Sequence, residues 1–188
     1  MNNNKKRMGV YPGTFSPFHT GHANILHQAL NVFDEVIIAR GVNPSKSHIE
    51  MDEFPIGHPV LRNAKVESFV GLLSDYLGTL DISGGAGVFL IRGLRNGDDL
   101  QYEQNQLQFI REMYPSLLTT FFICDRNFEH ISSSALRDLK KVSPKEYQKY
   151  VFQKPTGIIE PEEIEYYGTD ARFWGYGEII GGRFPGDL

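Results

Sequence analysis

An apolar segment, a turn and an amphipathic helix follow one another near the start of this chain. Residues 8–11 are apolar and predict a buried strand, and the Pro and Gly residues between positions 12 and 17 predict a turn. From Thr20, a residue type that favours helix N-caps, apolar residues recur at helical spacing at Ala23, Leu26, Leu30 and Phe33. His19 and His22 therefore lie where a strand passes into a helix, and the free N–H groups of a helix start favour phosphate.

Strands and helices alternate along the rest of the chain. A β-branched segment, residues 36–39, follows the first helix closely, which predicts a parallel pair with a right-handed crossover. Similar segments predict further strands at 66–69, 88–91 and 119–123. Helices are expected at 21–32, 70–80, from Asp98 or Asp99 to 113, from 131 to 140, and from Pro144. This alternation predicts an α/β fold with a doubly wound, parallel, five-stranded sheet.

Length and composition limit the class of protein. The 188 residues suffice for one well-packed domain, which we place at residues 1–152. Residues 153–188 are rich in Gly, acidic residues and aromatic residues and form an extension of unknown role. A net charge of −4 argues against a general nucleic-acid binder, and a single cysteine excludes a disulfide framework. Without a membrane-spanning apolar run or a signal peptide, we expect a soluble cytoplasmic protein with no membrane partner.

Polar residues follow several of the predicted strands. These are Thr14, His22, Lys46, Arg92, Arg95 and the serines at 132–134. The carboxyl ends of parallel strands share one edge of a sheet, so we expect these side chains to converge there. They are hydrogen-bond donors and cations, joined by Arg137 one turn into the last long helix, and they include no evident nucleophile. Such a site suits charge stabilisation during phosphoryl transfer.

Two motifs, His19-Thr20-Gly21-His22 and Ile131-Ser132-Ser133-Ser134, resemble the paired signatures of the nucleotidylyltransferase superfamily. Segments 11–15, 43–46, 91–95 and 99–103 resemble the phosphopantetheine adenylyltransferase family, in that family's motif order. The resemblance implies a Rossmann-like nucleotidylyltransferase fold. It also implies transfer of adenylate from ATP to 4′-phosphopantetheine, which gives dephospho-CoA and pyrophosphate in coenzyme A biosynthesis. Mg²⁺ is the implied cofactor, and a homo-oligomer, a hexamer in the family, is the implied assembly.

The resemblance also implies roles for individual residues. Catalytic roles fall to Thr14, His22, Lys46 and Arg92, with His22 stabilising charge in the transition state. The phosphopantetheine site would comprise Thr14, Lys46, Leu73 and Arg92. The ATP site would comprise Thr14, Phe15, His19, His22, Gly93, Leu94, Arg95, Glu103, Phe128, Ile131, Ser132, Ser133 and Ser134. No residue is implied as a metal ligand.

Two departures from the family pattern keep other functions open. Ser16 stands where the family has an aspartate, and the segment after Lys46 is shorter than usual. The chain would then use another phosphate acceptor, such as nicotinamide mononucleotide or glycerol 3-phosphate, or would bind nucleotide without catalysis.

Structural roles compete with the functional ones for several residues. His22 and Ser132 are candidate helix caps, and Arg92 and Arg95 are candidates for ion pairs with Asp98, Asp99 or Glu103. We interpret His27, His48 and His58 as surface or loop residues.

Overall fold

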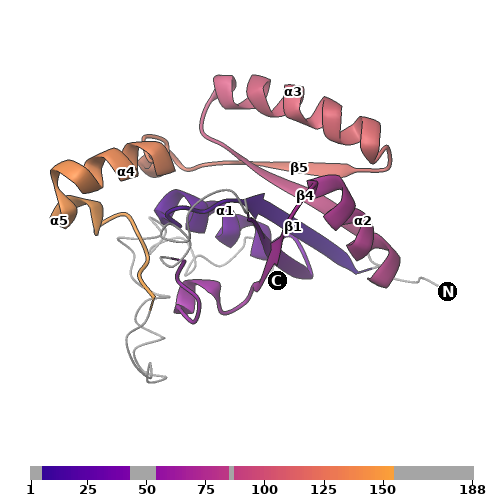
Figure 1. Cartoon of the computed structure of the whole chain (residues 1–188), viewed down its shortest axis with the longest axis horizontal. Coiled ribbons are helices and arrows are strands. Elements are labelled where there is room, and N and C mark those ends of the chain that lie inside the picture. The colour runs from indigo at the N-terminus through magenta and orange to yellow at the C-terminus, as the bar shows by residue number, and fades with distance from the viewer. Residues whose placement is uncertain (1–5, 43–53, 85–86, 155–188) are drawn as a thin grey trace, which may run out of the picture.

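The computed structural model describes residues 6–42, 54–84 and 87–154 (Figure 1). Five strands alternate with helices along these segments. The strands are β1 (Arg7–Gly13), β2 (Glu35–Gly41), β3 (Lys65–Phe69), β4 (Gly87–Leu94) and β5 (Leu118–Ile123). The helices are α1 (Thr20–Leu30), η2 (Pro59–Leu61), α2 (Leu73–Gly84), α3 (Gly97–Met113), η3 (Arg126–Phe128), α4 (Ser133–Val142) and α5 (Pro144–Tyr147).

The five strands form one parallel sheet in the order β3-β2-β1-β4-β5. Met8 of β1 pairs with Glu35 of β2 on one side and with Val88 of β4 on the other. The chain therefore winds outward in both directions from β1, which confirms the predicted doubly wound sheet. In such sheets ligands bind where the strand order reverses, and here that point lies between the carboxyl ends of β1 and β4.

Each face of the sheet has its own core, because alternate residues of a strand point to opposite faces. Tyr11 packs with Leu26 of α1 on one face. Its neighbour Val10 packs with Leu77 of α2 and Leu107 of α3 on the other. Burial on both faces explains why the central strands β1, β2 and β4 each contain a continuous apolar segment.

Two predicted helix starts are wrong in detail. The N-cap of α1 is His19 and not Thr20, because the His19 imidazole accepts the N–H of His22. The N-cap of α3 is Asn96 and not an aspartate, because its side chain accepts the N–H of Asp99. The Asp99 carboxylate is instead engaged with Arg95.

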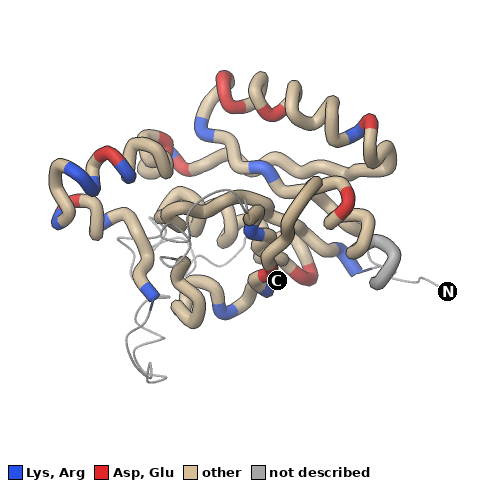
Figure 2. Tube along the Cα trace, viewed as in Figure 1, with Lys and Arg blue, Asp and Glu red and all other residues tan. Residues whose placement is uncertain are grey.

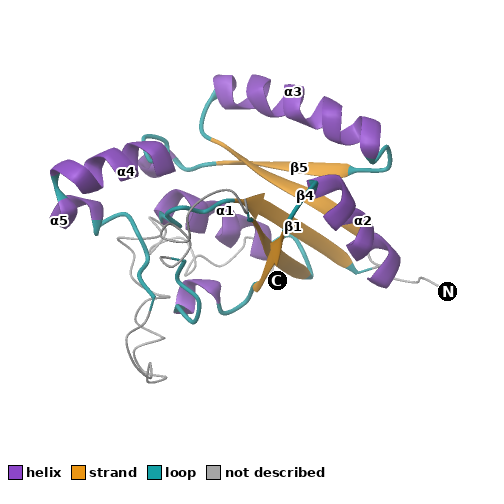
Figure 3. Ribbon diagram, in the orientation of Figure 1, coloured by secondary structure: helices purple, strands orange, loops and turns teal. Residues whose placement is uncertain are grey.

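Helices α4 and α5 form a small unit that lies on the opposite side of the picture from α2 (Figure 3). Ile131, Leu136 and Tyr147 form its core. Residues 150–152 then return to the first loop, where the Thr20 N–H donates to the Tyr150 carbonyl at 2.9 Å. No helix in the described segments is both long and apolar enough to cross a membrane.

Candidate active site

The loop between β1 and α1 is built around Phe15. This residue has a φ of 50°, in the left-handed region that side chains rarely adopt, and only 4% of it is exposed. Its ring packs edge-on against Tyr11 and His22, with centroid distances of 5.2 and 5.0 Å. The turn thus places the Phe15 ring in the core, in contact with His22.

His19 and His22 form a reciprocal pair at the start of α1. The His22 N–H donates to Nδ1 of His19 at 3.3 Å, and the His19 N–H donates to Nδ1 of His22 at 3.4 Å. Their rings stack with centroids 3.6 Å apart. Because both Nδ1 atoms accept hydrogen bonds, the proton of each neutral imidazole must be on Nε2.

Both imidazoles are held in the neutral form. Burial, reinforced by the nearby Arg95 cation, lowers the pKa of His19 to about 3. Burial is also the main cause that lowers the pKa of His22 well below its ordinary value, with His19 and Arg95 acting in the same direction. Nε2–H of His22 is therefore a neutral donor with a fixed tautomer, suited to stabilising negative charge that develops during a reaction.

Gly21 lies between the two histidines and allows a close approach. A Cβ at this position would lie 3.2 Å from the His19 ring and 3.8 Å from the carbonyl oxygen of Phe128. Because Gly21 has no side chain, the first turn of α1 and the segment before α4 can approach each other closely at this residue.

The end of β4 carries two arginines that pair with carboxylates of α3, as the structural alternative predicted. Nε of Arg92 lies 3.0 Å from Oε2 of Glu103, and both side chains are about one-fifth exposed (19% and 18%). Arg95 donates to both Asp99 oxygens through Nε and Nη2, at 2.8 and 2.7 Å. Acidic and basic residues are accordingly interspersed along this part of the chain (Figure 2). A phosphate that binds to Arg92 or Arg95 would therefore compete with the carboxylate that each arginine already contacts.

The start of α4 is attached to the first loop. Ser132 is the N-cap, as predicted, and accepts the N–H of Ala135 at 3.2 Å. Ser133 Oγ donates to the Pro17 carbonyl at 3.4 Å. Arg137 donates to the Ser16 carbonyl at 2.8 Å and to Ser134 Oγ at 3.0 Å. The sequence identified Arg137 only as a cation. Its position one helical turn after Ser134 indicates the hydrogen bond between these two residues.

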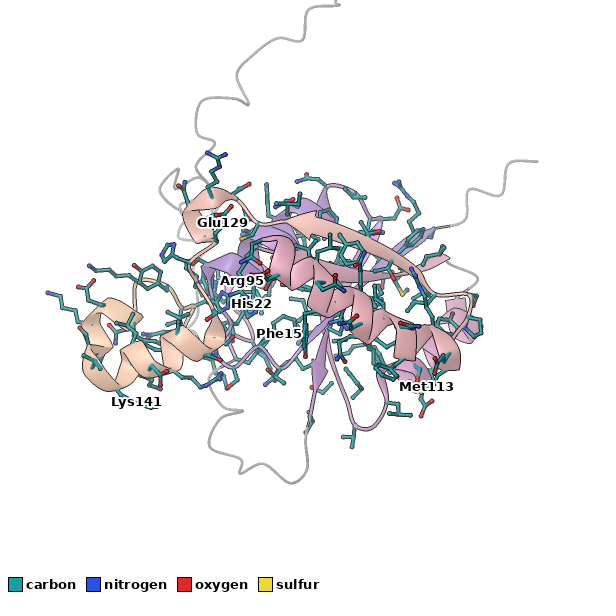
Figure 4. The ribbon with its side chains drawn as sticks, turned by 90° about the horizontal axis from the view of Figure 1, so that it is seen from above. Phe15, His22, Arg95, Met113, Glu129 and Lys141 are labelled. Atoms are coloured by element: carbon teal, nitrogen blue, oxygen red, sulfur yellow. The ribbon has the colours of Figure 1, made fainter. Side chains whose placement is uncertain are left out.

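Part of the predicted site converges at one end of the sheet. Figure 4 shows Phe15, His22 and Arg95 together near the start of α4, whereas Met113 lies at the other end of α3. Thr14 is exposed at the end of β1. Leu94 and Ile131 are buried, as Phe15 is.

Other predicted site residues lie apart or have additional roles. Leu73 packs against the core that α2 and α3 share. Gly93 makes room for α1, because a Cβ there would lie 2.8 Å from the Ile25 side chain. Lys46 and His48 lie outside the described residues. His58 is not simply a loop residue: it caps η2, and its ring packs on Phe152 at 5.1 Å.

The described residues offer neither a protein metal centre nor a reactive thiol. Within the three described segments, no group of three or more His, Cys, Asp or Glu residues has the geometry to hold a metal ion. Cys124 is buried, and burial together with the neighbouring Asp125 and Glu129 raises the pKa of its thiol to about 11. The described residues of the site supply imidazole, guanidinium, hydroxyl and carboxylate groups.

Comparisons with known proteins concern the family of this chain. The cytidylyltransferase-like family model matches residues 10–139. A phosphopantetheine adenylyltransferase of Dictyoglomus turgidum is 33% identical over 137 residues, which cover 70% of this chain and 82% of that protein. A phosphopantetheine adenylyltransferase of Cytophaga hutchinsonii is 34% identical over 140 residues, covering 72% and 90% of the two chains. This chain belongs to the phosphopantetheine adenylyltransferase family.

Solved structures support the fold of this family member. A putative nicotinate-nucleotide adenylyltransferase from Vibrio parahaemolyticus aligns with a TM-score of 0.53 at 16% identity, covering 86% of this chain and 97% of that chain. A nicotinic acid mononucleotide adenylyltransferase of Plasmodium falciparum aligns with a TM-score of 0.52 at 15% identity, covering 89% and 97%. At these identities the likeness concerns the Rossmann-like nucleotidylyltransferase fold alone.

Proposed function

We propose that this chain transfers the adenylyl group of ATP to 4′-phosphopantetheine, forming dephospho-CoA and pyrophosphate. The observation that carries the proposal is the neutral histidine pair at the sheet's switch point, in a chain that belongs to the phosphopantetheine adenylyltransferase family. A phosphate oxygen of the acceptor attacks the α-phosphorus, and the bond from that phosphorus to the bridging oxygen of pyrophosphate breaks. A phosphate monoester is largely ionised at neutral pH, so the attack needs no general base.

His22 acts on the α-phosphate in this proposal. Its Nε2–H donates to a non-bridging oxygen whose negative charge grows in the transition state, and the fixed tautomer removes any need to reorient. Thr14, exposed beside it at the end of β1, would donate its hydroxyl to the same region and contact both substrates.

The acceptor side is assigned to two cations, Arg92 in β4 and Lys46, which follows β2 in the sequence. Arg92 would hold the phosphate of 4′-phosphopantetheine, together with Lys46, which lies outside the described residues. Leu73 would contact the pantetheine arm. Holding both reactants in line supplies much of the rate enhancement in a reaction of this type.

The ATP side is assigned to the first loop, the end of β4 and the start of α4. His19 and the serines of α4 would meet the triphosphate, and Phe128 with the residues before α4 would flank the adenine. The remaining contacts are assigned to Phe15, Gly93, Leu94, Arg95, Glu103, Ile131, Ser132, Ser133 and Ser134. Mg²⁺ would enter on the triphosphate oxygens, because magnesium commonly keeps several waters and binds through substrate phosphates. It would neutralise charge on the pyrophosphate leaving group.

An acceptor assay tests the proposed reaction. The protein is incubated with ATP, Mg²⁺ and either 4′-phosphopantetheine, nicotinamide mononucleotide or glycerol 3-phosphate, and pyrophosphate release is followed. We expect turnover with 4′-phosphopantetheine and none with unphosphorylated pantetheine, which lacks the attacking group. Turnover confined to another acceptor, or ATP binding without any turnover, would overturn the proposal.

We also propose that the chain is a homo-oligomer and that residues 1–152 form its catalytic domain, followed by the 153–188 extension. Tyr102, Phe109 and Met113 lie along one side of α3 at helical spacing and are 63%, 64% and 51% exposed. Apolar exposure of this kind often marks a protein interface. Light scattering of F109E against Q104E tests the assembly, because Gln104 is exposed on another side of α3 and gains the same charge: only F109E should lower the molecular mass.

A further inference from the structure

A buried polar bridge connects α1 with the segment that follows β5. Asn24 is only 3% exposed, and its Nδ2 donates to Oδ2 of Asp125 at 2.6 Å. In return, the N–H of Asp125 donates to Oδ1 of Asn24 at 3.1 Å. Gln28 donates through Nε2 to the same Asn24 oxygen and to the Ile123 carbonyl, at 3.1 and 3.0 Å. Both ends of the Asn24 amide are therefore used, and the direction of the bridge is fixed.

The bridge lies close to the predicted ATP site without being part of it. Asn24 is two residues beyond His22 on α1, and Asp125 is the N-cap residue of η3. The preceding residue is fixed as well, because the Cys124 N–H donates to the Leu94 carbonyl at 2.7 Å. Three residues after Asp125, the Phe128 carbonyl reaches the space left by Gly21. The bridge thus fixes η3 against the first turn of α1.

We propose that Asn24 and Asp125 are positioning residues for the nucleotide: they hold the η3 segment, which carries Phe128, at the correct distance from His22. The proposal rests on the proposed adenylyl transfer and assigns the pair to the ATP side only. The described acceptor-side residues are Thr14, Leu73 and Arg92, and the hydrogen bonds of the bridge involve none of them. Disrupting the bridge should therefore weaken the binding of ATP and leave the binding of 4′-phosphopantetheine nearly unaffected.

Single substitutions disrupt the bridge in two ways. N24D places two carboxylates face to face at a separation where like charges repel strongly, and D125N places two amides there. We expect each to raise the KM for ATP about tenfold, with the KM for 4′-phosphopantetheine changed less than about twofold, since a tenfold effect matches one lost buried contact of ~1.4 kcal/mol. D125N adds no buried charge, so it remains informative if N24D folds poorly.

The exchanged double variant N24D/D125N provides the decisive measurement. It restores an amide facing a carboxylate, and the new carboxylate on α1 still accepts from Gln28 and from the backbone N–H of residue 125. We expect the KM for ATP to return to within about threefold of the original value, because coupled residues show strongly non-additive energies. N31D is the matched control: it makes the same change at an exposed position at the other end of α1, and its KM values should not change.

The outcomes distinguish this proposal from a merely structural role and from failure of the proposed function. Equal increases in both KM values, or a double variant no better than the singles, would overturn the positioning role. If the unaltered chain turned over no acceptor, the proposed reaction would fail. Calorimetric titration of ATP into the same four variants and the unaltered chain would then still test the bridge: unchanged affinity in the single variants would reject it.

Discussion

Two regions meet at the switch point of the sheet, and they are held in different ways. The first loop and the start of α1 are fixed by backbone hydrogen bonds and stacked neutral rings. The end of β4 is fixed by ion pairs between Arg92 or Arg95 and carboxylates of α3. The His19 side of the site is almost fully buried, whereas the Arg95 side chain is 38% exposed.

From this difference we expect the two regions to contribute to different steps of the reaction. In the proposed reaction, buried neutral donors that are already fixed need no reorientation, so they would stabilise the transition state. Cations already paired with carboxylates can exchange one anion for another, so they would bind the substrates. Changes in the first region should therefore lower kcat, and changes at the end of β4 should raise KM.

The largest expected effect comes from His22→Ala. We expect kcat to fall at least about 100-fold, ~3 kcal/mol, because a donor aimed at developing charge is lost. The affinity for ATP should change less than about threefold, because this bond strengthens mainly in the transition state. Steady-state kinetics and calorimetric ATP titration check the two quantities.

His27→Ala is the control for this experiment, since His27 is exposed on the same helix. Its kcat should match that of the unaltered chain. Equal losses of ATP affinity and turnover in H22A would contradict the division between the two regions.

The second prediction concerns the neutral histidines and pH. The pKa of His19 is about 3 in the folded chain, below the ordinary value of 6.5, so the unfolded chain takes up a proton first as the pH falls. The stability contributed by neutral His19 is complete above pH 6.5 and is lost progressively toward pH 3. At pH 5 the loss is about 2 kcal/mol for this imidazole.

His19→Asn tests this prediction, because asparagine is also a good N-cap and does not titrate. Urea denaturation at pH 7 and pH 5 should show a smaller loss of unfolding free energy in H19N than in the unaltered chain, by about 2 kcal/mol. H27N, at an exposed position, should lose as much as the unaltered chain. An identical pH dependence in H19N would mean that the imidazole is protonated in the folded state.

The sequence predicted the sheet, and the end of it at which His22 and Arg95 gather, because both follow from local patterns. Apolar segments of strand length, spaced by helices, dictate a parallel sheet, and the residues after each strand then share an edge. His22, Arg95 and Ser132 were placed correctly for this reason. The cap of α1 was not, because it depends on a pair of imidazoles, one of which packs against the Phe15 ring.

Contacts between distant parts of the chain were also missed. The Thr20 N–H finds its acceptor at Tyr150, and Asn24 finds its partner at Asp125, about a hundred residues away. Nothing in the local pattern around either residue indicates a partner, because each partner lies on a later segment that meets α1 only in the folded chain. The ion pairs of Arg92 and Arg95 were foreseen as alternatives because α3 follows β4 directly.

The third prediction probes the end of β4. Arg92→Lys keeps the charge but replaces a planar fork with a point charge, which is a poor substitute at a phosphate site. We expect the KM for 4′-phosphopantetheine to rise about tenfold, ~1.4 kcal/mol, with the KM for ATP nearly constant. Steady-state kinetics with each substrate varied in turn checks this, and K65R, far from the carboxyl edge at the start of β3, is the control. An increase confined to the KM for ATP would assign Arg92 to the ATP side and contradict the prediction.

The smallest expected effect tests whether the first region owes its rigidity to α4. Arg137→Met removes the hydrogen bond that joins α4 to the Ser16 carbonyl and a second hydrogen bond within α4, to Ser134 Oγ. Because these bonds are exposed to solvent, we expect the unfolding free energy to fall by only about 0.5–1 kcal/mol. A loop that moves more should still lower kcat several-fold while both KM values stay close to their original levels. K141M, an exposed change on the same helix, should alter neither quantity. If R137M instead raised the KM for ATP with kcat unchanged, Arg137 would be a ligand of the nucleotide. The group of substrate-binding cations at the end of β4 would then extend to α4.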